Sequence, residues 1–199
     1  QRDSILKVTQ RPDKLRLIPI GMAEQHFRLP PPGVVADPDQ IVFVGRLQHV
    51  KGVDILLRAF ALLLAERPSL RLKLVGSSFY QHAAKEEQQL HDLARQLGVD
   101  AQVEFAGPQP APAVARTMQE STLLVLPSRR ESFGSVLTEA LGCGIPVVAT
   151  RCGGPEDIVT ERVGALAEPE DPTALAAAIA CVLDHRARYD AAELSAYAH

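Results

Sequence analysis

The stretch TLLVLPSRRESFGSVLTEALGCGIPVVAT, residues 122–150, contains two apolar runs on either side of a short helical pattern. TLLVLP (122–127) and IPVVAT (145–150) are rich in Leu, Ile and Val, and the helical pattern covers residues 134–141. Continuous apolar strands separated by a helix are typical of a parallel sheet with both faces covered. The stretch therefore predicts one strand–helix–strand unit of such a sheet.

The same alternation continues on both sides of this unit. We predict further strands at 41–45, 70–76, 103–107 and 163–168. We predict the accompanying helices at 53–66, 82–97, 111–119, 155–160, 171–185 and 186–197. In the helix DPTALAAAIACVLDH, Asp171 is expected at the N-cap and Pro172 at the first helical position. The pattern predicts an α/β fold, a Rossmann-like parallel sheet with helices on both faces.

Composition and charge indicate a globular protein. Of 199 residues, 46% are hydrophobic and 23% are charged, and a chain of this length buries a core without needing a disulfide or a metal. The net charge of −3 gives no basic face for a nucleic acid. No apolar run approaches the roughly 18 residues of a membrane span. The three cysteines lack metal-type spacing, so we expect them to be reduced, buried packing residues of a cytoplasmic protein.

The first forty residues differ from the rest of the chain. LRLIPIGM (15–22) predicts a short strand with a turn at Gly21, and the proline-rich LPPPGVVADPDQ (29–40) favours an extended chain. Because the chain starts at Gln1 and not at a methionine, we expect it to be part of a longer protein. The predicted divisions are a linker and trailing segment of a missing amino-terminal domain at 1–38, the main domain at 39–185 and a carboxyl-terminal helix at 186–199.

Charged and glycine-rich segments follow two of the predicted strands. GRLQHVKG (45–52) places Arg46 and Lys51 directly after one strand, and ESFGS (131–135) opens a helix after another. Parallel sheets bind ligands at the carboxyl ends of their strands, and a helix N-terminus favours an anion. Each contact between a cation and an anion contributes roughly 4 kcal/mol at an effective dielectric of 20. The sequence therefore predicts a site for a diphosphate that needs no metal.

Two glutamates, Glu131 and Glu139, enclose the seven residues 132–138 of this segment. A carboxylate beside a diphosphate would repel it, whereas a carboxylate one sugar away accepts hydrogen bonds from hydroxyl groups. Glu139 lies five residues beyond Gly134, a helical rise of roughly 7–8 Å, comparable to the span from a β-phosphate to the ribose of a nucleotide. We therefore expect Glu139 at the ribose and Glu131 at the other end, where a transferred sugar would lie.

Taken together, these segments resemble the carboxyl-terminal, donor-binding domain of retaining GT-B fold glycosyltransferases, often called family 4 or glycosyltransferase group 1. The matching stretches are, in order, VGRLQHVKGVDILLRAF, KLVGSS, VEFAGP, PSRRESFGSVLTEALGCGIPVVAT and CGGPEDIV. The pair Glu131 and Glu139 matches the spaced glutamates of the family signature. The resemblance covers residues 15–199 and implies that 39–185 form a nucleotide-sugar (donor) binding domain, one half of a GT-B fold.

The resemblance also implies roles for single residues. Arg46 and Lys51 would hold the diphosphate and, with Glu131, form the catalytic set, by stabilising charge on the departing nucleotide. The remaining donor-binding residues would be Gly45, Gly76, Gly107, Phe133, Gly134, Ser135 and Glu139. At Phe133 the backbone amide is expected to contact the donor, while the side chain packs in the core. Gly153 and Gly154 are expected to form a turn.

The implied partners are a nucleotide-sugar donor and an acceptor, which would be a sugar, a lipid or a small molecule. The acceptor would bind mainly to the missing domain, through which the whole protein could associate peripherally with a membrane. The resemblance implies transfer with retention of configuration and no metal or other cofactor. The isolated chain is expected to bind nucleotide without transferring sugar at a useful rate.

Two other functions stay open at this point. A sugar-nucleotide 2-epimerase of the same overall fold would bind a UDP-sugar too, and an assay of epimerisation against transfer separates the two. A non-catalytic nucleotide-sugar binding module would regulate or scaffold a partner, and it would lack an acceptor domain elsewhere in its chain.

Overall fold

The computed structural model describes residues 21–77 and 83–198, without the side chains of residues 83 and 84. Most of the strand predicted at 15–22 and the first part of the predicted linker therefore lie outside the described residues. From residue 21 to 39 the chain forms turns and extended segments before the first strand begins.

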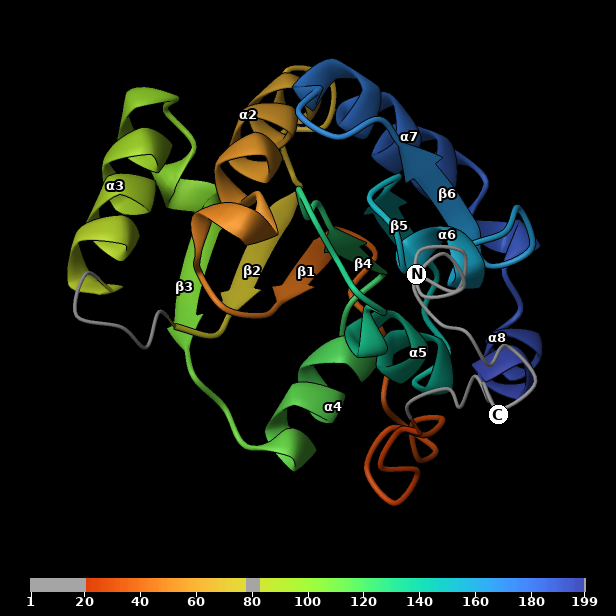
Figure 1. Cartoon of the computed structure of the whole chain (residues 1–199). Helices are drawn as coiled ribbons and strands as arrows, with labels where there is room; N and C mark the ends of the chain where they lie inside the picture. The colour runs from red at the N-terminus through yellow and green to blue at the C-terminus, as the bar shows by residue number, and fades with distance from the viewer. Residues whose placement is uncertain (1–20, 78–82, 199) are drawn as a thin grey trace, which may run out of the picture.

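Six parallel strands form a single sheet in the order β3-β2-β1-β4-β5-β6 (Figure 1). Their bounds are β1 Gln40–Val44, β2 Arg71–Val75, β3 Val103–Gly107, β4 Leu123–Leu126, β5 Val147–Thr150 and β6 Gly164–Ala167. The order runs outward from β1 to β3 and then restarts on the other side with β4, so Ile41 pairs with both Leu72 and Leu123. The predicted Rossmann-like sheet is confirmed, with its switch point between β1 and β4.

Helices cover both faces of the sheet (Figure 1). The α-helices are α2 Val53–Leu64, α3 Ala83–Gln96, α4 Ala111–Gln119, α5 Ser135–Gly142, α6 Pro155–Ile158, α7 Pro172–Asp184 and α8 Ala191–Ala198. The short 3₁₀ segments are η2 His49–Lys51, η3 Asp100–Gln102 and η4 Arg186–Arg188. On one face α2 packs against α7 and α3, and on the other α5 packs against α8 and α4. No described helix has the length and apolar character needed to cross a membrane.

The N-terminal starts of the last two α-helices, α7 and α8, show how capping side chains set helix boundaries. Asp171 caps α7 as predicted, because its side chain accepts hydrogen bonds from the amides of Thr173 and Ala174, both at 2.9 Å. The single helix predicted at 186–197 is wrong in its first part. Asp190 caps a separate helix by accepting from the amides of residues 192 and 193, so α8 begins after it.

The core lies between the sheet and its two helical layers. Every residue of β4 and β5 is buried. The continuous apolar runs in the sequence predicted this, because they are typical of strands covered on both faces. The prediction for the cysteines is only partly confirmed. Cys143 is buried, Cys152 is half-buried and Cys181 is exposed. Cys181 lies outside the face of α7 that packs on the core, which is formed by Leu175, Ala176, Ile179 and Val182.

Candidate donor-binding site

Three glycines lie side by side at the carboxyl ends of β1, β2 and β3. The amide of Gly45 donates to the carbonyl of Val75 at 3.0 Å, and the amide of Gly76 donates to the carbonyl of Gly107 at 2.9 Å. A Cβ atom on Gly76 would lie 1.9 Å from the carbonyl oxygen of Gly45, so no larger residue fits there. The structure thus brings together the three glycines predicted from the sequence, and they present backbone at this edge of the sheet.

Lys51 and Glu131 form an ion pair between the β1–α2 loop and the β4–α5 loop. Lys51 Nζ lies 2.5 Å from Glu131 Oε2, and the two side chains are only 17% and 14% exposed. The amide of Ser132 also donates to Glu131 Oε1 at 3.2 Å. A pair removed this far from water depends on each charge having its partner. The prediction placed Lys51 beside Arg46 as a diphosphate cation, whereas the structure pairs Lys51 with Glu131.

The backbone around Glu131 is supported by the loop that follows β5. Residue 131 forms a parallel bridge with Gly153, and the amide of Gly154 donates to the carbonyl of Glu131 at 2.9 Å. A Cβ atom on Gly154 would lie 2.4 Å from the Cα of Phe133. Sequence reasoning treated these two glycines as turn residues and missed this contact, because the two loops become neighbours through the pairing of β4 with β5, which the local sequence does not reveal.

The start of α5 faces the same edge of the sheet. Gly134 is buried and has a φ of 88°, and no side chain caps the helix there. The helix α5 begins at Ser135, and the free backbone amides of its first turn are able to bind an anion. Phe133 is half-buried and packs against the core, as its expected packing role requires.

Glu139 is half-buried on α5 and makes no ion pair or side-chain hydrogen bond with any residue that the structure describes. Burial raises its pKa above the ordinary value. One turn further on, burial and the charge of Glu139 raise the pKa of Cys143 to about 12. A carboxylate in such surroundings gains by accepting hydrogen bonds from a ligand's hydroxyl groups.

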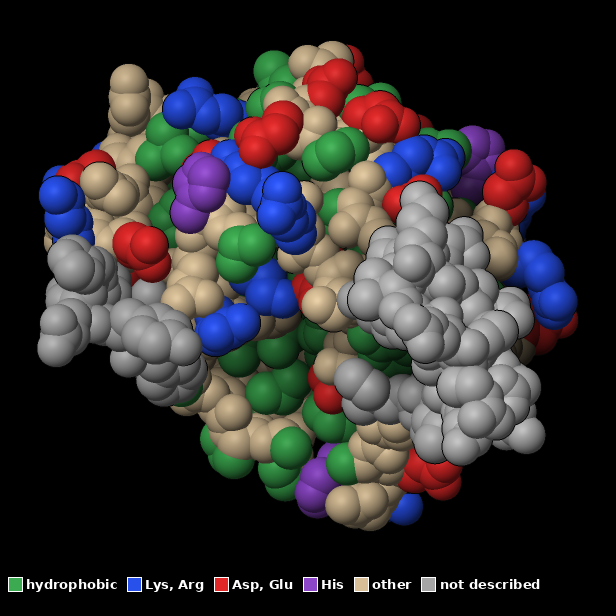
Figure 2. All heavy atoms as spheres, viewed as in Figure 1, with side chains coloured by type: hydrophobic (Ala, Val, Ile, Leu, Met, Phe, Trp, Pro, Cys, Tyr) green, Lys and Arg blue, Asp and Glu red, His purple; other side chains and the backbone are tan. Residues whose placement is uncertain are grey.

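Arg46 is exposed and makes no ion pair or hydrogen bond within the described part of the chain. It therefore differs from Lys51, whose charge is already matched by Glu131. Figure 2 shows Lys and Arg side chains grouped near the centre of the face that it presents, with His side chains among the surrounding groups. Arg46 and Lys51, the two cations predicted from the sequence, both follow β1, but Arg46 is exposed and unpaired among the described residues whereas Lys51 is paired with Glu131.

Sequence reasoning also missed Arg129, which lies in the same segment as Glu131. Its guanidinium binds both carboxylate oxygens of Asp54, at 2.7 and 2.8 Å, and also Glu170 and the carbonyl of His49. Burial raises the pKa of Asp54, but the hydrogen bonds and charge of Arg129 outweigh this and leave it below its ordinary value. The charged pair of arginines in PSRRES was the signal, but nothing local distinguishes Arg129 from its neighbour.

Acidic residues elsewhere in the described chain do not add a metal site to this edge. Asp37, Pro38 and Asp39 form an Asp-x-Asp sequence, but they precede β1 at the opposite end of the sheet, where Asp37 pairs with Arg71. Among the described residues, no three His, Cys, Asp or Glu side chains come together in a way that could hold a metal ion.

A doubly wound parallel sheet with a glycine-lined, charged carboxyl edge defines the chain as a Rossmann-like α/β domain, a fold whose ligands bind at that edge. The chain belongs to the family of glycosyl transferases group 1, whose model matches residues 28–199. Its curated relatives include the D-inositol 3-phosphate glycosyltransferase of Thermobispora bispora, which is 36% identical over 200 residues, covering 94% of this chain and 46% of that protein. D-inositol 3-phosphate glycosyltransferase 1 of Catenulispora acidiphila is 40% identical over 173 residues, which cover 84% of this chain and 41% of that protein. The chain therefore spans less than half the length of these curated relatives.

Solved structures of GT-B glycosyltransferases share this fold. HepE from Anabaena, solved in complex with UDP, superimposes with a TM-score of 0.86 at 25% identity, over 99% of this chain and 56% of that one. The carboxyl-terminal domain of LpcC, a glycosyl transferase group 1 family protein from Francisella tularensis, matches with a TM-score of 0.76. The match covers 88% of this chain and 94% of that domain. The second similarity, at 23% identity, concerns the fold alone.

Proposed function

We propose that this chain is the donor-binding half of a glycosyltransferase, which transfers a sugar from a nucleoside diphosphate sugar to an acceptor with retention of configuration. The observation that carries the proposal is the Lys51–Glu131 ion pair, held beside the uncapped start of α5 at the carboxyl edge of the sheet. HepE, whose match covers 99% of this chain and 55% of HepE itself, has been solved with UDP and glucose bound. A donor with a nucleotide, a diphosphate and a sugar has the charge and the hydroxyl groups that this edge complements.

The proposed chemistry follows from the charges around the diphosphate. In the transfer, the bond between the anomeric carbon and the β-phosphate oxygen breaks, and the nucleoside diphosphate leaves with the bonding electrons. The acceptor hydroxyl forms the new bond on the same face of the sugar, and its proton passes to the departing phosphate oxygen. Arg46, Lys51 and the first amides of α5 stabilise the charge that develops on the leaving group.

Two carboxylates then bind hydroxyl groups. Glu139, which has no partner among the described residues, accepts hydrogen bonds from the ribose. Glu131 faces the transferred sugar and shares Lys51 with the diphosphate. The backbone of Gly45, Gly76 and Gly107 contacts the donor without side chains. No metal is required for the donor to bind.

The acceptor would bind mainly to the part of the whole protein that this chain does not include. Residues 1–38 would connect to that part, 39–185 would bind the donor, and 186–199 would close the domain as its last helical segment. The relatives named D-inositol 3-phosphate glycosyltransferase make a phosphorylated polyol the first acceptor to test.

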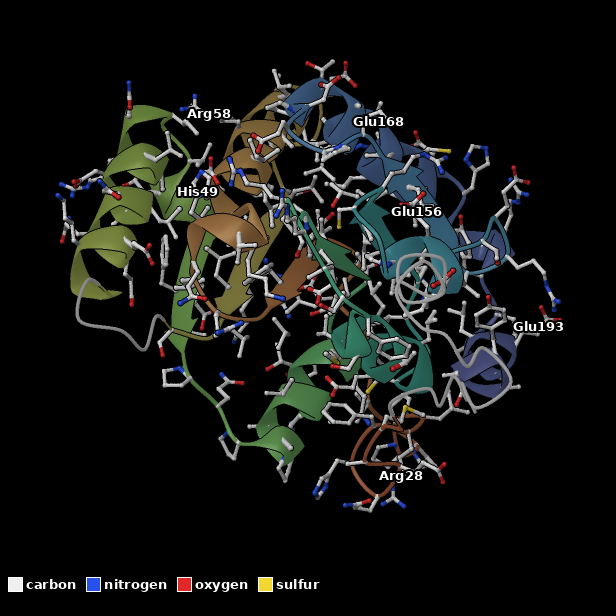
Figure 3. All side chains as sticks on the ribbon, in the orientation of Figure 1. Arg28, His49, Arg58, Glu156, Glu168 and Glu193 are labelled. Atoms are coloured by element: carbon white, nitrogen blue, oxygen red, sulfur yellow. The ribbon has the colours of Figure 1, made fainter. Side chains whose placement is uncertain are left out.

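Thermal unfolding with UDP, GDP, ADP and TDP, first in EDTA and then with magnesium, tests donor binding. A ligand at one hundred times its dissociation constant adds roughly 2.7 kcal/mol, which raises the midpoint by several degrees in a domain of this size. We expect one diphosphate to stabilise the chain in EDTA, and Arg46→Ala and Glu139→Ala to lose the effect. Arg58→Ala is the matched control, because Arg58 is an exposed arginine on the outer side of α2 (Figure 3).

Binding only in the presence of magnesium would contradict the metal-free part of the proposal. Stabilisation that survives both site substitutions would show that the nucleotide binds elsewhere. An assay of the whole protein with the identified UDP-, GDP-, ADP- or TDP-sugar, with and without an acceptor, separates transfer from epimerisation of the donor.

A further inference from the structure

Arg129 joins three loops at the carboxyl edge of the sheet. From the β4–α5 loop it reaches Asp54 at the start of α2, Glu170 in the β6–α7 loop and the carbonyl of His49 in η2. The bond to the His49 carbonyl is 2.6 Å long, and the two bonds to Glu170 are 2.5 and 3.1 Å. We call Arg129, Asp54, Glu170 and the His49 carbonyl the Arg129 clamp. The Arg129 side chain is only 13% exposed, whereas the side chains of Asp54 and Glu170 are 30% and 57% exposed.

The Arg129 clamp uses the shape of the guanidinium and not only its charge. Two parallel hydrogen bonds run to the two oxygens of Asp54, and a further pair runs to Glu170. A planar fork of this kind cannot be reproduced by a lysine, which offers one compact ammonium. Glu170 has a φ of 61°, a left-handed conformation that no other described non-glycine residue adopts. The β6–α7 loop is therefore held in an uncommon shape where it meets Arg129.

Both members of the Lys51–Glu131 ion pair lie close along the chain to residues that Arg129 binds or adjoins. The backbone amide of Arg129 donates to the carbonyl of Val50 at 2.8 Å, and Lys51 is the next residue. Glu131 follows Arg129 by two positions. Figure 3 labels His49, the first residue of η2, on the side of the molecule toward α3. A shift of the Arg129 guanidinium would therefore move the two loops that carry the ion pair relative to one another.

We propose that Arg129 is a positioning residue for the donor diphosphate: the Arg129 clamp holds Lys51 and Glu131 in the arrangement in which they meet the ligand. The inference rests on the proposed function, because it concerns the affinity of the same site. Arg129 does not touch the donor. It acts through Lys51, and its contribution to binding disappears when Lys51 is removed. A clamp that served stability alone would leave the contribution of Lys51 to binding unchanged.

Titration calorimetry of the 199-residue chain with UDP tests the inference. We expect Arg129→Lys to raise the dissociation constant about tenfold and Glu170→Gln, at the half-exposed end of the clamp, about threefold. Arg67→Lys is the matched control, because Arg67 forms an ion pair with Asp184 outside the site, and it is expected to bind UDP as the unaltered chain does. Circular dichroism identifies any variant that is unfolded, and Glu170→Gln keeps the test decisive if Arg129→Lys does not fold.

The double variant separates positioning from stability. Lys51→Ala is expected to weaken UDP binding about tenfold in the unaltered chain but less than about twofold in the Arg129→Lys background, as for two residues that act together. Equal losses in both backgrounds, or unaltered affinity in folded Arg129→Lys and Glu170→Gln, would overturn the inference and leave the proposed function intact. A folded, unaltered chain that binds none of UDP, GDP, ADP and TDP would overturn the proposed function itself, and the inference with it.

Discussion

At the scale of single residues, the site contains both charged side chains that are paired and a carboxylate that is not. Lys51 and Glu131 are matched to one another, while Glu139 carries a half-buried carboxylate without a partner among the described residues. Burial without a partner disfavours the ionised form of a carboxyl group. Glu139 therefore costs folding stability at neutral pH, as is common for a group whose partner is a ligand.

Glu139→Gln tests this cost through its dependence on pH. Because the pKa of Glu139 is raised in the folded chain, protonation favours folding, and this contribution is lost as the pH rises through the folded pKa. We expect Glu139→Gln to raise the unfolding midpoint at pH 7 by about 1–3 °C, given that 1 kcal/mol corresponds to roughly 2–4 °C at this size. The difference should vanish at a pH below the ordinary value of the carboxyl pKa. Melting curves from pH 4 to pH 7 measure it, and a variant less stable than the unaltered chain at pH 7 would show that Glu139 has a stabilising partner.

At the scale of elements, the site is made by loops that approach one another through backbone. Gly52 ends η2 with a φ of 66°, and a Cβ atom there would lie 2.0 Å from the carbonyl oxygen of Pro127. This contact holds the β1–α2 loop against the β4–α5 loop, which the Arg129 clamp also joins. The close approach therefore places the loop that carries Lys51 beside the loop that carries Glu131.

Gly52→Ala and Gly98→Ala separate the effect of this approach from the effect of backbone conformation. Gly98 has nearly the same φ, 70°, but nothing lies within 4 Å of its missing Cβ. We expect Gly98→Ala to cost about 1 kcal/mol of unfolding free energy, and Gly52→Ala about 2–3 kcal/mol, because Gly52→Ala adds a collision with backbone. Urea unfolding measures both. Equal losses would mean that the two loops can separate at little cost.

At the scale of the whole molecule, the chain has the fold of a GT-B glycosyltransferase domain but spans 46% and 41% of two curated relatives. The sheet, its two helical layers and the candidate donor site are all contained in the described residues. The proposed acceptor site is not assigned to any of them. Binding of nucleotide and transfer of sugar should therefore be separable.

The isolated chain is expected to bind a nucleoside diphosphate and to transfer sugar at less than about one thousandth of the whole protein's rate, because catalysis needs the acceptor held in contact with the donor. Product formation from the matching nucleotide sugar and an inositol phosphate, measured for both proteins, tests this. Comparable turnover by the 199-residue chain would place the acceptor site within it.

The local pattern of the sequence determined the elements, because the periods of strands and helices and the capping of α7 by Asp171 depend on residues close together in the chain. It also carried the family resemblance and the segments that meet at the carboxyl edge. The tertiary structure alone decided that Lys51 pairs with Glu131, 80 positions away, and that Arg129 joins Asp54, 75 positions away. It also decided which surfaces of α7 and α8 are buried. Such contacts depend on the order of strands in the sheet and on the approach of loops across it, and neither is encoded by the spacing of neighbouring residues.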